Sequence, residues 1–209
     1  MDVTAEHLKA AVMSYFRFER QWLVATEVNY SELSGIADIL CDTGTEIIEV
    51  ETKVSKSDLV DLEWKKKKHD YFKQLEGDLI SKHVPNKYYV CVPKNLTRLA
   101  ESFIGDVNPG YGLMTFDTRE EKIHSRIITI TKHPKPLHSG YDSSVRDILV
   151  MRLCSEVANF YLHKANSTFQ RSLRHSQEAQ KEGNSGRKKG YRRPSGIIDP
   201  YLEVAPEEN

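Results

Sequence analysis

The 209 residues are enough for one domain that buries a substantial core, and equal numbers of basic and acidic residues give zero net charge. Net charge therefore neither favours nor excludes a nucleic-acid partner. We find no signal peptide and no apolar stretch long enough to span a bilayer, so we expect a soluble cytoplasmic protein without a membrane partner. The cysteines are far apart and lack Cys-x-x-Cys spacing. This spacing favours buried, reduced thiols at Cys41, Cys91 and Cys154 over a disulfide framework or a zinc site.

The first third of the chain is predicted to be a helix followed by strands. An amphipathic helix is predicted over residues 4–20, with Thr4 as its N-cap. Alternating apolar residues then predict strands over residues 22–28, 35–41 and 45–54. The turn sequence at residues 42–44 joins the last two strands, which we therefore expect to form an antiparallel hairpin.

The remainder alternates helices and strands. A long helix is predicted from residue 57 to about 81, followed by a buried strand over 87–93. That strand should run parallel to an earlier one, because a helix crosses over between them. Further elements are a helix over 96–103, strands over 112–116 and 122–131, and a helix over 143–163. We expect a domain over residues 1–165 and a basic, poorly ordered tail over 166–209, where apolar content falls.

Charged residues interrupt the two strands of the predicted hairpin. Asp38 lies within an apolar run, where an unpaired carboxylate is unfavourable. On the next strand Glu49, Glu51 and Lys53 share one face because side chains alternate, and Asp38 can reach that face if the hairpin register allows. Two adjacent carboxylates form a hard oxygen site suited to Mg²⁺ or Mn²⁺, with the Thr52 backbone carbonyl as a further ligand.

Such a site has the chemistry of phosphodiester hydrolysis. A divalent ion polarises the scissile phosphate and lowers the pKa of a bound water. Lys53 could orient that water or neutralise charge developing on the phosphate. The alternative is structural, because a Glu-x-Glu-x-Lys alternation is also typical of any half-exposed strand. Asp38, which interrupts the preceding apolar strand, favours the nuclease interpretation.

The ordered motifs resemble the PD-(D/E)XK nuclease superfamily, and most of all the MmcB-like putative DNA repair nucleases. The matching stretches are residues 36–38, 51–58, 67–71 and 88–93. The resemblance covers roughly residues 22–116 and implies an α/β fold with a restriction-endonuclease-like three-layer core, a central mixed β-sheet flanked by helices, and a divalent metal. It departs from the family at Ile36, where an arginine is usual, and no proline precedes Asp38.

The resemblance also points to residues around the proposed catalytic set of Asp38, Glu51 and Lys53. Glu27 matches a position where many such nucleases place an additional acid, and a solvent-exposed strand end is the alternative. Lys67 and Tyr71, one helical turn apart, match a pair that holds the substrate backbone. Lys68 lies closer to the apolar stripe of this helix than Lys67, so the sequence leaves open which lysine points inward.

These residues predict a Mg²⁺- or Mn²⁺-dependent nuclease that acts on DNA, with RNA as an alternative substrate and a homodimer as a compatible state. The competing hypothesis is a catalytically inactive nucleic-acid-binding or scaffold protein on the same fold. The basic segment at residues 187–193 would add non-specific affinity for phosphate backbones, and a merely soluble tail is an equal alternative.

Overall fold

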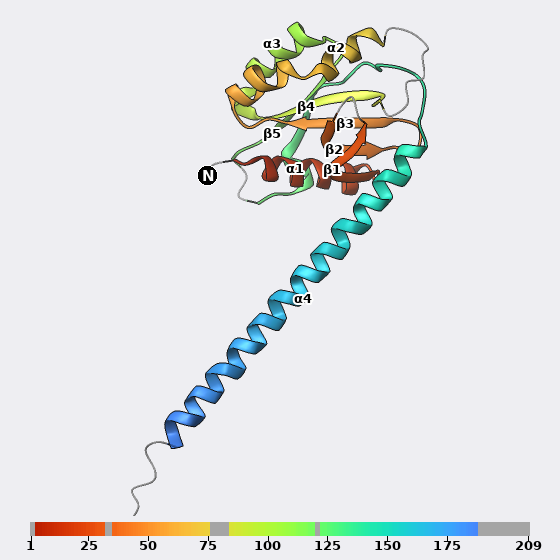
Figure 1. Ribbon diagram of the computed structural model, residues 1–209. Coiled ribbons are helices and arrows are strands. Elements are labelled where there is room, and N and C mark those ends of the chain that lie inside the picture. The colour runs from red at the N-terminus through yellow and green to blue at the C-terminus, as the bar shows by residue number, and fades with distance from the viewer. Residues whose placement is uncertain (1–2, 32–34, 76–83, 120–121, 188–209) are drawn as a thin grey trace, which may run out of the picture. The chain divides into compact units, whose positions relative to one another are not determined.

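The structure is a computed structural model that describes residues 3–31, 35–75, 84–119 and 122–187 (Figure 1). Within these ranges one mixed sheet contains six strands in the order β1-β2-β3-β4-β5-β6. Strands β1, β2 and β3 pair antiparallel, β3, β4 and β5 pair parallel, and β6 returns antiparallel to β5. Their bounds are Leu23–Ser31, Gly35–Asp42, Ile47–Thr52, Lys87–Pro93, Gly112–Phe116 and Ile128–Lys132. The predicted hairpin and the parallel strand that follows it are both confirmed.

Helices cover both faces of this sheet. Helix α1 (Ala5–Ser14) continues into a π-helical turn (Tyr15–Glu19), and both pack on the face that carries Cys91. Helix α2 (Lys67–Gln74) and helix α3 (Thr97–Val107) pack on the opposite face, which carries Val90 and Val92. Figure 1 shows α2 and α3 on the side of the sheet away from α1. The predicted α/β fold, with a central mixed sheet flanked by helices, is confirmed.

The start of α1 follows from its sequence. Thr4 is the N-cap, its hydroxyl accepts a hydrogen bond from the His7 backbone N–H, and the His7 ring accepts one from the Thr4 N–H. Together these bonds satisfy two of the amide groups that a helix N-terminus leaves without partners. The apolar side chains of this helix then enter the core as Leu8, Ala11 and Val12.

The single helix predicted over residues 57–81 is not formed. Instead, a π-helical turn (Asp58–Leu62) and a 3-10 turn (Glu63–Lys65) precede Lys66, whose extended backbone (φ −72°, ψ 122°) separates them from α2. In one continuous helix, Lys66 and Lys68 would point in widely different directions. The extended residue lets both ammonium groups reach the same buried carboxylates, and those ion pairs outweigh local helix propensity. The rest of the predicted helix, residues 76–83, lies outside the described residues.

Helix α4 spans Ser144–Arg187, so residues 166–187 are helical where a poorly ordered tail was expected. This stretch contains no proline and includes three Arg, three Gln and two Glu, which favour helix. The chain divides into compact units at residues 1–157 and 158–209. Residues 188–209, which include most of the basic segment, lie outside the described residues.

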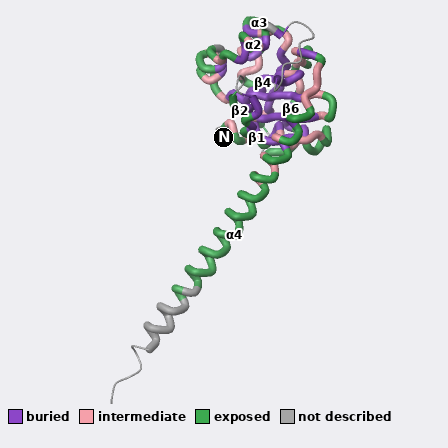
Figure 2. The backbone as a smooth tube through the Cα atoms, turned by 45° about the vertical axis from the view of Figure 1, so that its right-hand side comes forward, coloured by how far each residue is buried: buried purple, intermediate pink, exposed green. Residues whose placement is uncertain are grey.

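Among the α4 side chains that the structure describes, Val145 and Leu149 in the first turns are buried apolar ones. Val145 and Leu149 pack with Leu40 and other residues of the β1–β2–β3 end of the sheet. Val157 and Phe160, which continue at helical spacing from Leu149, are 54% and 64% exposed, and Figure 2 shows α4 as mostly exposed. For the same reason the prediction of a buried thiol is wrong for Cys154 and confirmed for Cys41 and Cys91. None of the described helices combines the length and apolar character that crossing a membrane requires.

Gly112→Ala is expected to destabilise the domain by about 1–3 kcal/mol, because it overpacks the core where β5 meets β4. An added Cβ would lie 2.5 Å from Tyr89 Cδ1 and 2.9 Å from Pro134 Cδ. The Tyr89 ring is itself buried. Gly105→Ala, within α3, is the control, since nothing lies within 4 Å of its added Cβ. Gly105→Ala should raise the free energy of unfolding, measured in urea, by about 0.5–1 kcal/mol. Similar urea midpoints for Gly112→Ala and Gly105→Ala would contradict the predicted overpacking.

Candidate active site

Asp38, in the middle of β2, and Glu51, near the end of β3, occupy facing positions. The antiparallel ladder pairs Ile39 with Val50, which makes Asp38 and Glu51 the next facing positions. Asp38 Oδ2 accepts hydrogen bonds from the Thr52 backbone N–H and from the Thr52 hydroxyl, both at 2.8 Å. Burial raises the pKa of Asp38, and the nearby Glu51 charge raises it further. The hairpin register therefore makes Asp38 and Glu51 facing residues, although their carboxylates contact different partners.

Glu51 is surrounded by ammonium groups. Lys53 Nζ donates to Glu51 Oε1 at 2.9 Å, Lys68 Nζ donates to Oε2 at 2.7 Å, and Lys66 Nζ also contacts Oε1. Burial disfavours the ionised carboxylate, but Lys68, Lys66 and Lys53 more than offset that effect and lower the pKa of Glu51. Glu51 is therefore a buried anion whose charge is already compensated by the protein.

Lys53 lies between two buried acids. Its Nζ is 2.9 Å from Glu51 Oε1 and 3.0 Å from Glu63 Oε2, and Asp58 lies 3.6 Å away. Burial alone would lower the pKa of Lys53, but the charges of Glu51 and Glu63 outweigh it and raise the pKa. Lys53 is consequently a protonated donor at neutral pH, held in the position that the sequence predicted relative to Glu51.

Sequence reasoning missed Glu63, the carboxylate that joins this cluster to the helical layer. Glu63 is fully buried, 2.8 Å from Lys66 Nζ and 3.0 Å from His69 Nε2, and it accepts from the Tyr88 hydroxyl at 3.0 Å. His69, to which the sequence gave no chemistry, is buried and also contacts Tyr111. Burial opposes ionisation of Glu63, but His69 and the lysines lower its pKa. Glu63 follows Leu59 by one helical turn, and this spacing was the feature of the sequence that could have indicated that Glu63 is buried.

The structure also settles which lysine of the basic run points inward. Lys68 is 2% exposed, and besides Glu51 it contacts Glu49 Oε1 at 2.9 Å, whereas Lys67 is exposed. Glu49 in turn accepts from the Tyr30 hydroxyl at 2.5 Å. Lys68 therefore positions two buried carboxylates, while Lys67 and the partly buried Tyr71 lie on the neighbouring helix surface.

Glu27 lies in β1 opposite Asp38, as the flanking pairs Thr26–Ile39 and Val28–Ala37 require. Its backbone has φ 51°, a left-handed conformation that is uncommon outside glycine and re-aims the side chain. Lys9 of α1 contacts Glu27, and its Nζ lies 3.7 Å from Asp38 Oδ1. Glu27 and Asp38 are thus connected through one ammonium group.

The candidate ligand atoms are of the chemical type that binds a hard divalent cation. Asp38, Glu51 and the Thr52 carbonyl supply only oxygen atoms, as Mg²⁺ and Mn²⁺ prefer. Across the described ranges, however, no three His, Cys, Asp or Glu side chains are grouped in a way that could hold a metal ion. Lysine ammonium groups lie against Glu51 and Asp38 and supply positive charge there.

Comparison with known proteins gives no functional assignment. No family model matches the sequence, and no curated protein does. Among solved structures, the chain is similar to a protein of unknown function from Silicibacter pomeroyi, with 14% identity and a TM-score of 0.47. That match covers 77% of this chain and 91% of the other.

Proposed function

We propose that this protein is a divalent-metal-dependent nuclease that hydrolyses phosphodiester bonds in DNA, as the resemblance to the PD-(D/E)XK superfamily implies. The observation that supports the proposal best is the contact between Asp38 and Thr52. It ties the Asp38 carboxylate to the residue that lies between Glu51 and Lys53 in the chain. Carboxylates can hold a divalent ion, and an ammonium group can stabilise charge that develops on a phosphate.

Asp38, Glu51 and the Thr52 carbonyl would hold the metal, with Glu27 as the candidate for a further ligand. When bound, Mg²⁺ or Mn²⁺ supplies Lewis acidity at the phosphate and an activated water. Lys53 is an ammonium group at neutral pH, because neighbouring acids raise its pKa, so it donates to a phosphate oxygen rather than accepting a proton. Lys68 keeps Glu51 in position, and exposed Lys67 is assigned to the DNA backbone.

The second candidate is a catalytically inactive nucleic-acid-binding or scaffold protein on the same fold. One observation favours it: three lysines already neutralise Glu51 and Glu63, so the cluster is electrostatically complete without a metal ion. A buried ion network of this kind can serve only to fix the packing of a core.

Incubation of the purified protein with supercoiled plasmid DNA distinguishes the two candidates. Cleavage is expected with Mg²⁺ or Mn²⁺ and should stop on chelation with EDTA, because the phosphate needs the Lewis acid. Calorimetric titration with Mn²⁺ should show binding that disappears in a variant lacking the Asp38 carboxylate. If the protein binds DNA but does not cleave it, and if metal binding does not depend on the Asp38 carboxylate, the result would contradict the nuclease proposal and support the second candidate.

A further inference from the structure

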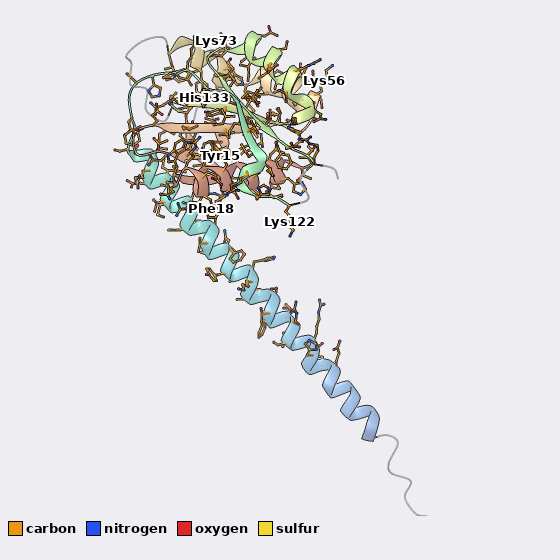
Figure 3. All side chains as sticks on the ribbon, turned by 180° about the vertical axis from the view of Figure 1, so that it is seen from behind. Tyr15, Phe18, Lys56, Lys73, Lys122 and His133 are labelled. Carbon is orange, nitrogen blue, oxygen red and sulfur yellow. The ribbon has the colours of Figure 1, made fainter. Side chains whose placement is uncertain are left out.

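Helix α4 exposes apolar side chains along residues 158–175. Leu162 and Phe169 are 61% and 60% exposed, and no residue of α4 after Leu153 belongs to the hydrophobic clusters that the described residues form. Figure 3 shows side chains projecting from both sides of the α4 ribbon. Helices in proteins owe most of their stability to the packing of an apolar face. This part of α4 therefore carries an apolar face that remains open to a partner.

Large and small residues alternate on this face at a seven-residue spacing. Leu162 and Phe169 are seven residues apart. The small residues that lie three or four positions from them repeat with the same spacing, and these are Ala158, Ala165 and Ser172. The charged residues between positions 158 and 178 all lie on the opposite side of the helix, as Lys164, Arg171, Arg174 and Glu178. A seven-residue repeat of this kind is typical of a helix that packs along a second helix.

The alternation of large and small residues also indicates the direction of the second helix. In an antiparallel pair of α4 helices related by a two-fold axis, Leu162 can face Ala165 of the second copy. In the same register Phe169 faces Ala158 of the second copy, because seven residues forward along one helix are seven residues back along the other. Every large side chain then meets a small one. In a parallel pair Phe169 would meet Phe169, which leaves crowded layers beside empty ones.

The extent and charge of the face suit a second copy of this chain. Tyr161 and Leu173 border the repeat and are 63% and 40% exposed. Each large side chain of the face leaves on the order of 100 Å² to be covered, so two helices together would bury on the order of 1,000 Å². That area is about the smallest found in specific protein–protein interfaces. The other bordering residues, at positions 159, 166 and 168, are uncharged, so no like charges meet across the pair.

We propose that residues 158–175 of α4 form an antiparallel coiled coil with the same residues of a second copy, which makes the protein a dimer. The partner is a second copy because the face is complementary to itself. The small residues that receive Leu162 and Phe169 lie on the same helix as those two side chains. The inference is independent of the proposed nuclease function, since none of these residues contributes to the cluster around Glu51.

Sedimentation equilibrium of the full chain tests the dimer, and the expected mass is twice the 24.0 kDa of one chain. Phe169→Glu should raise the Kd of the dimer by about a hundredfold, because it places a charge inside the apolar contact, while glutamate still favours helix. Phe160→Glu is the matched control and should leave this Kd unchanged. Phe160 is as exposed as Phe169, at 64%, but lies on the opposite side of α4.

Two outcomes of this experiment would overturn the proposal. One is a monomer at every concentration of the unmodified protein, including the case in which that monomer co-sediments with phosphatidylglycerol vesicles, since the face would then bind lipid. The other is an equal rise of Kd in Phe169→Glu and Phe160→Glu, since the contact would then not lie on the face that carries Leu162 and Phe169.

Disulfide cross-linking tests the antiparallel direction. Ala158→Cys and Phe169→Cys are prepared as separate proteins, each with Cys154→Ser because Cys154 is exposed. Mixed and oxidised, the two should give a covalent dimer, since facing positions come within the roughly 7 Å between Cα atoms that a disulfide can span. Neither should cross-link alone, because the same residue in the two copies would be separated by roughly 16 Å along the helix axis. Cross-linking of either protein alone, or of neither mixture, would overturn the antiparallel pairing.

Discussion

Asp38→Asn is expected to reduce metal-dependent DNA cleavage by about 100-fold to 1,000-fold while the fold is retained. The substitution removes a charged oxygen ligand, and losses of this size are typical when an electrostatic contact at a reacting phosphate is removed. The amide oxygen of asparagine can still accept the two hydrogen bonds from Thr52. Initial rates of plasmid cleavage in Mg²⁺ measure the loss.

The stability of this variant follows from the pKa of Asp38. Burial raises that pKa, so at neutral pH the ionised carboxylate is less favourable in the folded protein than in the unfolded chain. A neutral amide removes this cost, and thermal unfolding at pH 7 should occur at the same temperature or a higher one. Asp70→Asn, at an exposed position of α2, is the control and should retain full cleavage. Undiminished cleavage by Asp38→Asn would remove Asp38 from the catalytic site.

Lys68→Met is expected to cost about 3–5 kcal/mol of unfolding free energy, the usual effect of removing one partner from a buried ion pair. Lys68 is 2% exposed and contacts Glu49 and Glu51, which would both remain buried without their shared ammonium group. Lys67→Met is the matched control, since its exposed neighbouring side chain should change stability by less than about 0.5 kcal/mol. Urea unfolding at pH 8 measures both.

The same measurement at pH 5 checks that charge is the cause. Lys68 contributes most among the cations that lower the pKa of Glu51, so its removal lets the carboxylate take up a proton at higher pH. The stability gap between variant and unmodified protein should therefore narrow at pH 5. In the unmodified protein, the lowered pKa of Glu51 and Glu63 gives stability that is present above about pH 4.3 and lost on further acidification. A gap independent of pH would point to lost packing instead.

The antiparallel hairpin illustrates what local sequence can specify. The turn at residues 42–44 and the alternation of apolar residues on either side predict that β2 and β3 pair antiparallel. That Asp38 faces Glu51 depends on the register, which the structure supplies. The same periodicity located the parallel strand β4 and the helix α3, because both signals arise within short stretches of chain.

The break at Lys66 illustrates what local sequence could not specify. Residues 57–81 carry a helical pattern, and nothing in that stretch reveals that Glu51, more than ten residues earlier, needs two of its lysines at once. The extended conformation of Lys66 is stabilised by contacts that exist only after β3 and the helical layer have packed together. Burial of Glu63 against His69 and Tyr88 has the same origin.

By itself the sequence determined the order of the strands along the chain, the antiparallel hairpin and the strands on which Asp38 and Glu51 lie, because each depends on periodicity or on a turn. Only the tertiary structure decided which lysines enter the site and that Glu63 completes it. It also decided that α4 leaves most of its apolar side chains exposed. The physical reason is that buried charges are compensated by whichever partners packing brings near them, and those partners are distant in sequence.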